Sequence, residues 1–512
     1  MLTSVYSAGN CGVDGFIVTV ECNSLEKMEK FEVVGLPDAS VREAKERVRT
    51  ACRNSGYLFP ESEITVNLAP ADRRKEGTGF DLAILLGILG SAGYLHDTSL
   101  DGRCFVGELS LSGDIRPVRG VLCMCAAAKD AGFKEFYAPA ANAAEAAAVD
   151  GITVYGVKNV NELVRHILGK EQIKPSVCNR EAYSERFGEF DVDFADIKGQ
   201  VMAKRAMEIA AAGGHNILLI GPPGTGKSML AKRLPTILPP LSFDEAVETT
   251  KIHSVAGLLP ENVSLLCRRP FRSPHHTMSA VSMVGGGANP VPGEVSLAHN
   301  GVLFLDELPE YQKSVTDALR QPLEDRKVTI TRVSGRVTYP CSFMLVCAMN
   351  PCKCGYFGHP TEKCTCGAGA VQKYISRISG PLLDRIDIEV EMPSLTMDEM
   401  TSAAKGESSA VIRERVEKAR KFAEKRFAGM AGIYCNAQIT PGKTDELVMM
   451  TDEAKMIIKK SFENCGLSAR AYDRIIRVAR TIADLDASEK VLPKHVAEAI
   501  QYRALDKKYW RR

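Results

Sequence analysis

One glycine-rich loop in the sequence has the composition of a phosphate-binding loop. It spans residues 221–228, follows the apolar run 216–220 and precedes the helix-like run 229–234. Glycines have no Cβ, so the main chain can curl and turn its N–H groups, with a helix N-terminus behind them, toward phosphate oxygens. A lysine late in such a loop reaches the β- and γ-phosphates, and the hydroxyl that follows it binds Mg²⁺. The predicted contacts with Mg-ATP are therefore Gly221, Pro222, Pro223, Gly224, Thr225, Gly226, Lys227 and Ser228.

Two adjacent carboxylates end a second apolar run, residues 301–307. At the C-terminal edge of a strand, Asp306 would bind Mg²⁺ through water beside Ser228. Glu307 would then polarise the water that attacks the γ-phosphate. An acidic pair after a strand is common by itself, but downstream of a phosphate-binding loop it predicts the hydrolytic half of the same site.

A third apolar run, residues 343–349, ends in Asn350. If this strand lies between the other two, the Asn350 side chain at its tip is in position to orient the attacking water. The alternative is that Asn350 only begins the turn before Pro351. Its place in the series favours the first interpretation.

Four cysteines lie close together in residues 352–366, which we call the cysteine knuckle. Their spacing is C-x-C, a nine-residue loop, and a second C-x-C, so a compact hairpin could fold four thiolates around one tetrahedral Zn²⁺. His359 could replace one thiolate. Unmetallated buried thiols and a redox disulfide pair are the alternatives. The predicted structural zinc ligands are Cys352, Cys354, Cys364 and Cys366.

The bulk composition is that of an ordinary soluble protein of several domains. At 512 residues the chain is too long for one hydrophobic core. Lys and Arg exceed Asp and Glu by only 65 − 63 = 2, so net charge neither favours nor excludes a nucleic-acid partner. The chain shows no signal peptide and no apolar run of about 18 residues, and sparse cysteines argue against a disulfide scaffold. We expect a cytoplasmic protein with no membrane contact.

The pattern of apolar residues divides the chain into four parts. Residues 1–170 mix strand-like runs with helix-like ones, residues 140–149 among them, and predict an α+β domain. Residues 171–190 are polar, lack periodicity and predict a linker. Residues 191–395 repeat strand, turn and helix, as expected of a parallel α/β sheet. Residues 396–512 are helical throughout and end in a short basic tail, residues 506–512, which we expect to be solvated.

The order of these motifs resembles that of the AAA+ ATPases, particularly the magnesium-chelatase and minichromosome-maintenance branch. The resemblance identifies Asp306 and Glu307 as Walker B and Asn350 as a sensor-1 residue. It also assigns Gly199 and Gln200 to the segment that packs near the adenine.

Two arginines gain roles from the same resemblance. Arg385, within Leu382–Asp387, would be an arginine finger that reaches the γ-phosphate of a neighbouring subunit; the alternative is a surface salt bridge with Asp384 or Asp387. Arg470 would be the sensor-2 arginine that closes the lid. Arginine suits both roles because it is always charged and its fork fits phosphate oxygens.

Longer segments narrow the resemblance to the ComM/YifB family over essentially the full length. The segments that carry it are residues 211–216, 271–277, 285–300 and 377–387. The resemblance implies a motor that forms a ring, expected to be a hexamer. It further implies a DNA helicase that drives branch migration during integration of transforming DNA.

Two segments are candidates for DNA contact. Residues 327–339 alternate polar and apolar side chains and predict a β-hairpin with Arg332 and Arg336 near its tip at Ser334. In related AAA+ modules a hairpin before sensor 1 lines the pore, where arginines would contact phosphates without reading bases. Solvated charges on an exposed hairpin are the alternative. Residues 273–287 form the other candidate pore loop.

His275 and His276 invite a metal or acid–base interpretation. Adjacent histidines point in different directions on regular elements, and no third ligand is spaced to join them. We therefore expect a loop contact near the ATP site or the pore.

The N-terminal part resembles the Lon-type protease domain, which uses a Ser–Lys dyad. On that pattern Gly79 stands where the serine would be and Leu122 where the lysine would be. We expect no peptidase activity. The domain would be a scaffold or a partner-binding element, and its basic cluster, residues 73–75, could contact DNA.

Three functions remain open at this point. The first is an ATP-driven ring that translocates DNA. The second is a protein-remodelling, chaperone-like ATPase with an inactive protease-like domain. The third is a metal-insertion subunit of the chelatase type, which the Lon-like domain and the cysteine knuckle disfavour.

Overall fold

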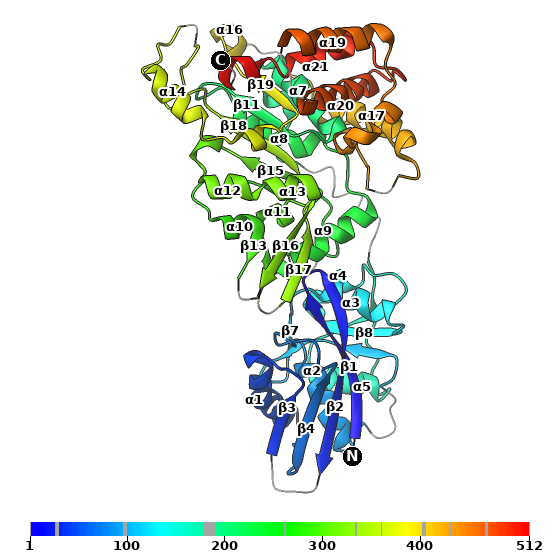
Figure 1. Cartoon of the computed structure of the whole chain (residues 1–512). Helices are drawn as coiled ribbons and strands as arrows, with labels where there is room; N and C mark the ends of the chain where they lie inside the picture. Colours follow the sequence, from blue (N-terminus) through cyan, green and yellow to red (C-terminus); the bar gives the residue numbers. More distant parts are fainter. Residues whose placement is uncertain are drawn as a thin grey trace.

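The computed structural model describes residues 2–25, 30–95, 100–178, 190–260, 263–287, 289–332, 335–359, 361–401, 406–430, 432–465 and 469–510. Most of the predicted linker, residues 179–189, and the hairpin tip Ser334 lie outside the described residues. The chain builds an N-terminal unit (residues 2–176), a parallel-sheet core and a helical C-terminal part (Figure 1).

The N-terminal unit is an eight-stranded mixed sheet in the order β10-β9-β8-β5-β1-β2-β4-β3. Alternate side chains of β1 and β2 point to opposite faces, where α1 and α2 cover one side and α3 and α4 the other. The strands of this sheet are β1 (Leu2–Cys11), β2 (Asp14–Leu25), β3 (Lys30–Val34), β4 (Glu63–Ala69), β5 (Arg103–Phe105), β8 (Glu135–Pro139), β9 (Thr153–Val157) and β10 (Pro175–Ser176). β6 (Glu108–Leu109) and β7 (Ile115–Arg116) pair in a separate two-stranded sheet. The helices are α1 (Ala39–Asn54), α2 (Asp81–Ser91), α3 (Val121–Asp130), α4 (Ala143–Ala146) and α5 (Val160–Ile167).

One helix prediction in this unit is wrong. Residues 140–149 have the composition of a single helix, but they form a 3₁₀ turn, η1 (Ala140–Asn142), and the single turn α4. The break has a visible cause, because Asn142 turns its side chain to Val118 instead of leaving the backbone to continue as a helix.

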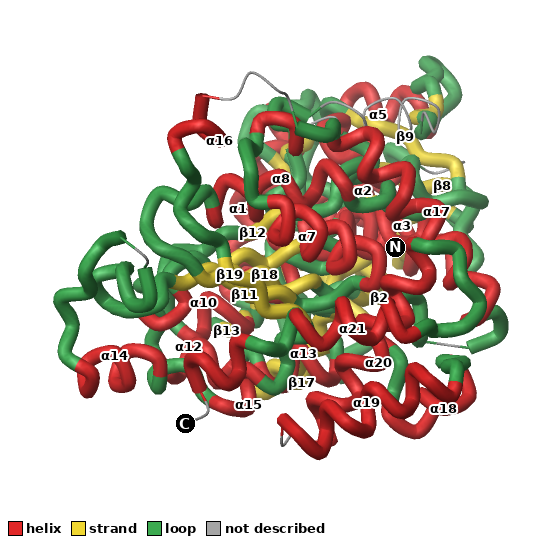
Figure 2. The backbone as a smooth tube through the Cα atoms, turned by 90° about the horizontal axis from the view of Figure 1, so that it is seen from above, coloured by secondary structure: helices red, strands yellow, loops and turns green. Residues whose placement is uncertain are grey.

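The core is a five-stranded parallel sheet in the order β12-β15-β18-β11-β19. Leu218 and Ile220 face one layer of helices and Ile217 and Leu219 the other, so both faces are buried, as the continuous apolar runs require (Figure 2). The strands are β11 (Ile217–Ile220), β12 (Phe271–Arg272), β15 (Val302–Leu305), β18 (Met344–Met349) and β19 (Ile388–Glu391). Two hairpins project from the core: β13 (Gly285–Gly286) with β14 (Val291–Pro292), and β16 (Lys327–Arg332) with β17 (Gly335–Pro340). The core helices are α7 (Val201–Gly213), α8 (Lys227–Ile237), α9 (Phe243–Ala256), α10 (Ala280–Val284), α11 (Glu294–Leu297), α12 (Lys313–Ala318), α13 (Arg320–Asp325), α14 (Ala368–Ile375) and α15 (Gly380–Leu383), with 3₁₀ turns η3 (Phe194–Asp196) and η4 (Leu308–Glu310).

The C-terminal helices are α16 (Met397–Thr401), α17 (Ser409–Phe427), α18 (Thr444–Leu447), α19 (Asp452–Cys465), α20 (Ala469–Leu485) and α21 (Pro493–Gln501), with 3₁₀ turns η5 (Asn436–Gln438) and η6 (Pro441–Lys443). From α17 onward they pack on α7 and α8 through one apolar cluster, which joins them to the core. The last described turn, η7 (Asp506–Trp510), does not match the expected solvated tail, because Tyr509 is only 4% exposed. Among the described residues, no helix is both long and apolar enough to cross a membrane.

Candidate nucleotide site

The predicted phosphate-binding loop connects β11 to α8. Its left-handed turns fall on Gly224 (φ 80°) and Gly226 (φ 86°), where a side chain would be strained. The ammonium of Lys227 donates to the carbonyl oxygens of Gly221 (2.7 Å) and Pro222 (2.8 Å). Lys227 also donates to Oδ1 of Asn350 at 3.1 Å. The structure therefore brings together the loop, its lysine and the predicted sensor-1 residue.

The carboxylate of Asp306 lies beside the hydroxyl of Ser228. Ser228 Oγ donates to Asp306 Oδ2 at 2.6 Å, and the main-chain N–H of Glu307 donates to Asp306 Oδ1 at 3.0 Å. Mg²⁺ in phosphoryl-transfer sites is held by one or two oxygen side chains together with the phosphates of the nucleotide. This oxygen pair, at the C-terminal ends of β11 and β15, fits such an ion.

Strand order explains the convergence of these groups. β18 lies between β11 and β15 and is parallel to both. The carboxyl ends of all three strands therefore meet at one edge of the sheet, which is where parallel sheets bind ligands. Asn350 follows the middle strand of the three, which is the arrangement that its predicted role requires.

Glu307 has a left-handed backbone (φ 52°) that turns its side chain away from the strand direction. Its carboxylate is 58% exposed and lies 3.5 Å from Nδ1 of His276. The ring of His276 packs on that of His275, with centroids 4.1 Å apart. The histidine pair therefore meets the nucleotide site through Glu307.

Gly199 and Gln200 connect the phosphate-binding loop to the segment after β19. The amide of Gln200 donates to Pro393 O at 2.8 Å and to Thr225 O at 3.4 Å. Gly199 is held close to Leu395, whose Cδ2 would lie 2.7 Å from a Cβ at that position. This segment closes a second side of the site.

The environment of Lys227 leads to a pH prediction. Burial lowers the pKa of Lys227 to about 8, against the attraction of Asp306. A bound triphosphate favours the ammonium form, so above pH 8 binding must include proton uptake. Nucleotide affinity should therefore be constant below that pKa and fall by up to about tenfold per pH unit above it.

Titrating a fluorescent ADP analogue at several pH values measures this effect. In Lys227→Arg the guanidinium stays charged, so the fall should vanish. An affinity of the unmodified protein that is constant up to about pH 9.5 would contradict the assignment.

The two predicted arginines lie at the opposite edge of the same sheet. Arg385 precedes β19 by three residues, and β19 begins beside Ile217, the start of β11, whereas the phosphate-binding loop follows the other end. Its guanidinium pairs with Glu324, a partner that sequence analysis missed, and donates to Pro381 O at 2.8 Å. Arg470 donates to Asp384 at 3.0 Å and is 67% exposed. The structure thus groups Arg470 with Arg385 and places neither beside Lys227.

A buried charge network fixes this arginine edge to α20. Asp387 accepts from His215 Nδ1 at 3.3 Å and lies within 3.9 Å of both Arg474 and Arg477. Burial opposes its ionisation, but the hydrogen bond from His215 and these charges together hold the pKa of Asp387 well below its usual range. Because α20 also carries Arg470, the network ties the helix that bears Arg470 to the segment that bears Arg385.

The four predicted metal ligands converge. Their sulfur atoms all lie within 4.8 Å of one another, with Cys352 Sγ 3.3 Å from Cys354 Sγ and 3.7 Å from Cys364 Sγ. His359 is not part of the group, because its Nε2 lies 2.8 Å from Ser394 Oγ. Four converging sulfurs are the donor set of a tetrahedral thiolate site, which fits Zn²⁺.

The predicted β16–β17 hairpin forms, with Thr331 opposite Arg336 and with both Arg332 and Arg336 exposed. It lies beside the other candidate pore segment, since a Cβ on Gly286 would lie 3.2 Å from Nη2 of Arg332. The β1–β2 turn of the N-terminal unit lies next to this hairpin (Figure 1). A Cβ on Gly12 of that turn would lie 2.5 Å from Cγ1 of Val337. The two candidate DNA segments therefore form one surface.

The basic cluster at residues 73–75 does not form a free cationic surface. Lys75 is fully buried and donates to Pro70 O, and its pKa is lowered by burial. Arg73 lies over the ring of Phe16 at 5.2 Å, and Arg74 is 3.6 Å from Glu76. Lys75 therefore cannot take part in the DNA contact expected of this cluster, whereas a contact through the exposed Arg73 and Arg74 stays a prediction.

The positions of the absent protease dyad fall in and beside a cavity of about 290 Å³ that Gly79 lines. Thr78 donates to the carboxylate of Glu108 there. Leu122 is buried in an apolar contact with Leu241 of the core. Leu122, at the position of the lysine in the Lon-type pattern, is thus part of the junction between the N-terminal unit and the core.

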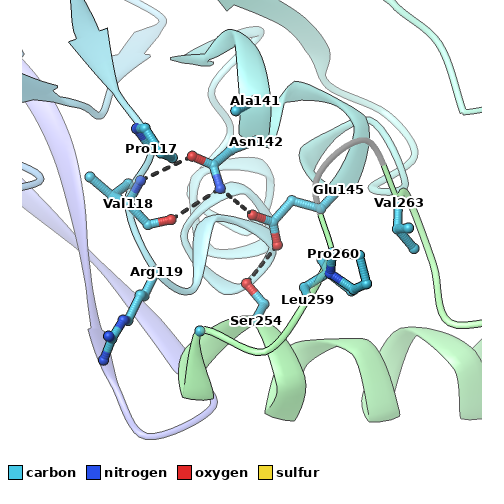
Figure 3. Close-up of a pocket in the computed structure, with 11 residues that line it drawn as sticks. Pro117, Val118, Arg119, Ala141, Asn142, Glu145, Ser254, Leu259, Pro260 and Val263 are labelled. Atoms are coloured by element: carbon cyan, nitrogen blue, oxygen red, sulfur yellow. Dashed lines mark hydrogen bonds between the residues drawn. The ribbon is translucent and has the colours of Figure 1, made fainter.

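A second cavity, of about 280 Å³, lies at that junction (Figure 3). Glu145 accepts a hydrogen bond from Ser254 of α9 at 2.5 Å and one from Asn142 at 2.7 Å. Burial raises the pKa of Glu145, and these two hydrogen bonds oppose the rise. No local sequence signal marks this pair, because its members are 109 residues apart.

Comparison with known proteins agrees with this architecture. The sequence matches family models for the magnesium chelatase subunit ChlI over residues 20–142 and 193–400 and for its C-terminal part over residues 406–503. It is 41% identical over 508 residues to the competence protein ComM of Haemophilus influenzae, covering 98% of each chain. It is 40% identical over 511 residues to the protein YifB of Escherichia coli K12, covering 99% of this chain and 98% of the relative.

A more distant similarity reaches the minichromosome-maintenance branch. The DNA replication licensing factor mcm6 of Dictyostelium discoideum is 23% identical over 353 residues, covering 66% of this chain and 34% of that protein. The full-length matches indicate one protein family. The parallel-sheet core and the convergence of the phosphate-binding loop, Asp306 and Asn350 agree with it. The chain belongs to the ComM/YifB family of magnesium-chelatase-like AAA+ ATPases.

Proposed function

We propose that the protein assembles into a ring, with six subunits as the expected number, and uses Mg-ATP hydrolysis to move DNA. The observation that carries this proposal is the separation of the nucleotide groups between two edges of one sheet. Lys227 and Asp306 occupy one edge, while Arg385, which is half-buried, and Arg470, which is exposed, lie at the other. A protomer stacked on its neighbour would bring one edge against the other and complete the site.

The residues then divide the work of hydrolysis. Lys227 neutralises the β- and γ-phosphates, while Ser228 and Asp306 hold Mg²⁺. Glu307 positions and polarises the attacking water, with Asn350 beside it. Arg385 and Arg470 would stabilise the charge that develops on the γ-phosphate of the adjacent subunit.

DNA is the proposed load because of the surface formed by the two hairpins. Arg332 and Arg336 are exposed on it, and their guanidinium groups are suited to phosphate oxygens. The proposed role is integration of transforming DNA by branch migration in the cytoplasm. The name of the Haemophilus relative, a competence protein, supports a role in competence. The similarity to a DNA replication licensing factor supports DNA over a protein load.

The ATPase rate with and without forked or single-stranded DNA tests this proposal. We expect DNA to raise the rate and added salt to suppress the effect, because phosphate contacts release counterions. The double variant Arg332→Ala, Arg336→Ala should lose most of the stimulation. Lys459→Ala, Lys460→Ala removes the same charge from the exposed surface of α19 and serves as the matched control.

Indifference to every DNA structure in an active ATPase would refute the DNA proposal. Stimulation by an unfolded protein instead would favour the chaperone-like alternative, in which the N-terminal unit is the substrate platform.

We further propose that the cysteine knuckle binds one structural Zn²⁺ through Cys352, Cys354, Cys364 and Cys366. The support is the mutual approach of four sulfurs in a segment that forms no helix or strand among its described residues. With all four positions filled by protein, the ion would be structural and not catalytic.

A further inference from the structure

The cysteine knuckle lies directly against the phosphate-binding loop. Gly355, between the two halves of the cysteine cluster, has φ +90°, and a Cβ at that position would lie 2.5 Å from Cδ of Pro223. Pro223 belongs to the loop itself, and Cys352 follows Asn350 by only two residues. The first half of the knuckle therefore contacts the loop and also follows the predicted sensor-1 residue directly in the chain.

A second contact reaches the opposite side of the nucleotide site. His359 Nε2 lies 2.8 Å from Ser394 Oγ. Ser394 follows Pro393, whose carbonyl oxygen accepts the hydrogen bond from Gln200. The knuckle thus touches both segments that border the nucleotide.

The C-terminal turn η7 packs on the knuckle from outside. Tyr509 and Cys352 belong to one apolar cluster, and Trp510 packs against it together with the other three cysteines. Lys508 lies 2.6 Å from Glu391, and the Tyr509 hydroxyl donates to the same carboxylate at 3.0 Å. Glu391 is paired with Ile220, the last residue before the phosphate-binding loop. The turn therefore ties the knuckle to the strand ends that bear the loop.

These contacts place the cysteine knuckle where its shape can affect the position of the phosphate-binding loop. The knuckle forms no helix or strand among its described residues, so its shape depends on cross-links between distant parts of its loop. We infer that a metal ion bound by the four cysteines braces the phosphate-binding loop through Gly355 and Pro223, so that metal occupancy sets nucleotide affinity. The inference rests on the zinc site proposed above and deepens it.

Removing and restoring the metal in the full-length protein tests the inference. Zinc content would be measured before and after chelation, and Mg-dependent binding of a fluorescent ADP analogue would be followed in each state. We expect metal removal to weaken nucleotide binding by about tenfold or more, because a displaced loop no longer directs its main-chain N–H groups at the phosphates. Reloading with Zn²⁺ should restore the affinity.

Two glycine variants locate the effect. Gly355→Ala keeps all four thiols but forces a side chain against Pro223, and should weaken nucleotide binding whether or not the metal is retained. Gly367→Ala is the matched control, because a Cβ there meets no atom within 4 Å. Its affinity and zinc content should equal those of the unmodified protein.

Three results would overturn the inference. They are a native protein that contains no metal, a nucleotide affinity that chelation leaves unchanged, and a Gly355→Ala protein with normal affinity. DNA-stimulated hydrolysis serves as a separate readout. If DNA does not stimulate hydrolysis while zinc still controls nucleotide affinity, the DNA proposal is refuted and the inference about the metal is retained.

Discussion

Replacing Arg385 by alanine should lower the ATP turnover of the assembled protein by about a thousandfold, the lower end of the range for an arginine finger supplied by a neighbour. Binding of Mg-ATP to the isolated protomer should change little, because Arg385 lies at the far end of β19 from the phosphate-binding loop of its own chain. The measurements are steady-state hydrolysis and equilibrium binding on the same preparation. Glu324→Ala, which removes only the partner of Arg385 in this structure, should leave turnover within a few-fold of normal.

Mixing two kinds of variant subunit shows whether Arg385 acts on the nucleotide site of a neighbouring subunit or on that of its own chain. Arg385→Ala subunits keep an intact phosphate-binding loop, and Lys227→Ala subunits keep an intact arginine edge. A mixed ring therefore contains interfaces that pair a working loop with a working arginine. Hydrolysis should recover to a measurable fraction of normal. If mixed rings are shown to assemble and yet remain inactive, the arginine does not act on its neighbour.

Replacing Glu307 by glutamine should reduce hydrolysis by about a hundredfold or more while nucleotide remains bound. The amide keeps the size of the side chain but cannot accept a proton from the attacking water. The phosphate contacts of Lys227 and the oxygen pair of Ser228 and Asp306 are untouched. Single-turnover hydrolysis and retention of radiolabelled ATP measure the two effects together.

The neighbouring carboxylate supplies the control for this variant. Glu310 is three residues further along the chain, and its side chain pairs with Arg377 at 2.8 Å instead of facing the site. Glu310→Gln should hydrolyse ATP at nearly the normal rate. If Glu307→Gln retained at least half the normal turnover, another group would have to activate the water.

The residues that could be predicted from the sequence are those whose geometry is local. The phosphate-binding loop needs glycines at fixed offsets between a strand and a helix, and both the offsets and the flanking elements are contiguous in the chain. Asp306 and Asn350 were predictable for a related reason. Each ends a fully apolar strand, and parallel strands present their carboxyl ends at one edge. The two C-x-C pairs likewise restrict where four sulfurs can meet.

Other features depend on packing between distant segments, and only the tertiary structure decided them. The pairing of Arg385 with Glu324, the burial of Lys75 and the turn of His359 toward Ser394 leave no mark in local spacing. Arg470 is exposed beside Asp384 because α20 docks on the buried Asp387 network. That network joins residues from three separate segments of the chain. The composition of the basic tail predicts a solvated end, yet its two aromatic residues pack against the cysteine knuckle.

By itself, then, the sequence determined the chemistry of this protein: which groups can bind triphosphate, magnesium and a thiolate metal, and in which strands and loops they stand. The tertiary structure decided which edge of the sheet each group occupies and what braces it. The physical reason is that backbone preference and side-chain chemistry act over a few residues. The burial of apolar surface and of paired charges instead joins positions a hundred or more residues apart, as it does for Glu145 and Ser254.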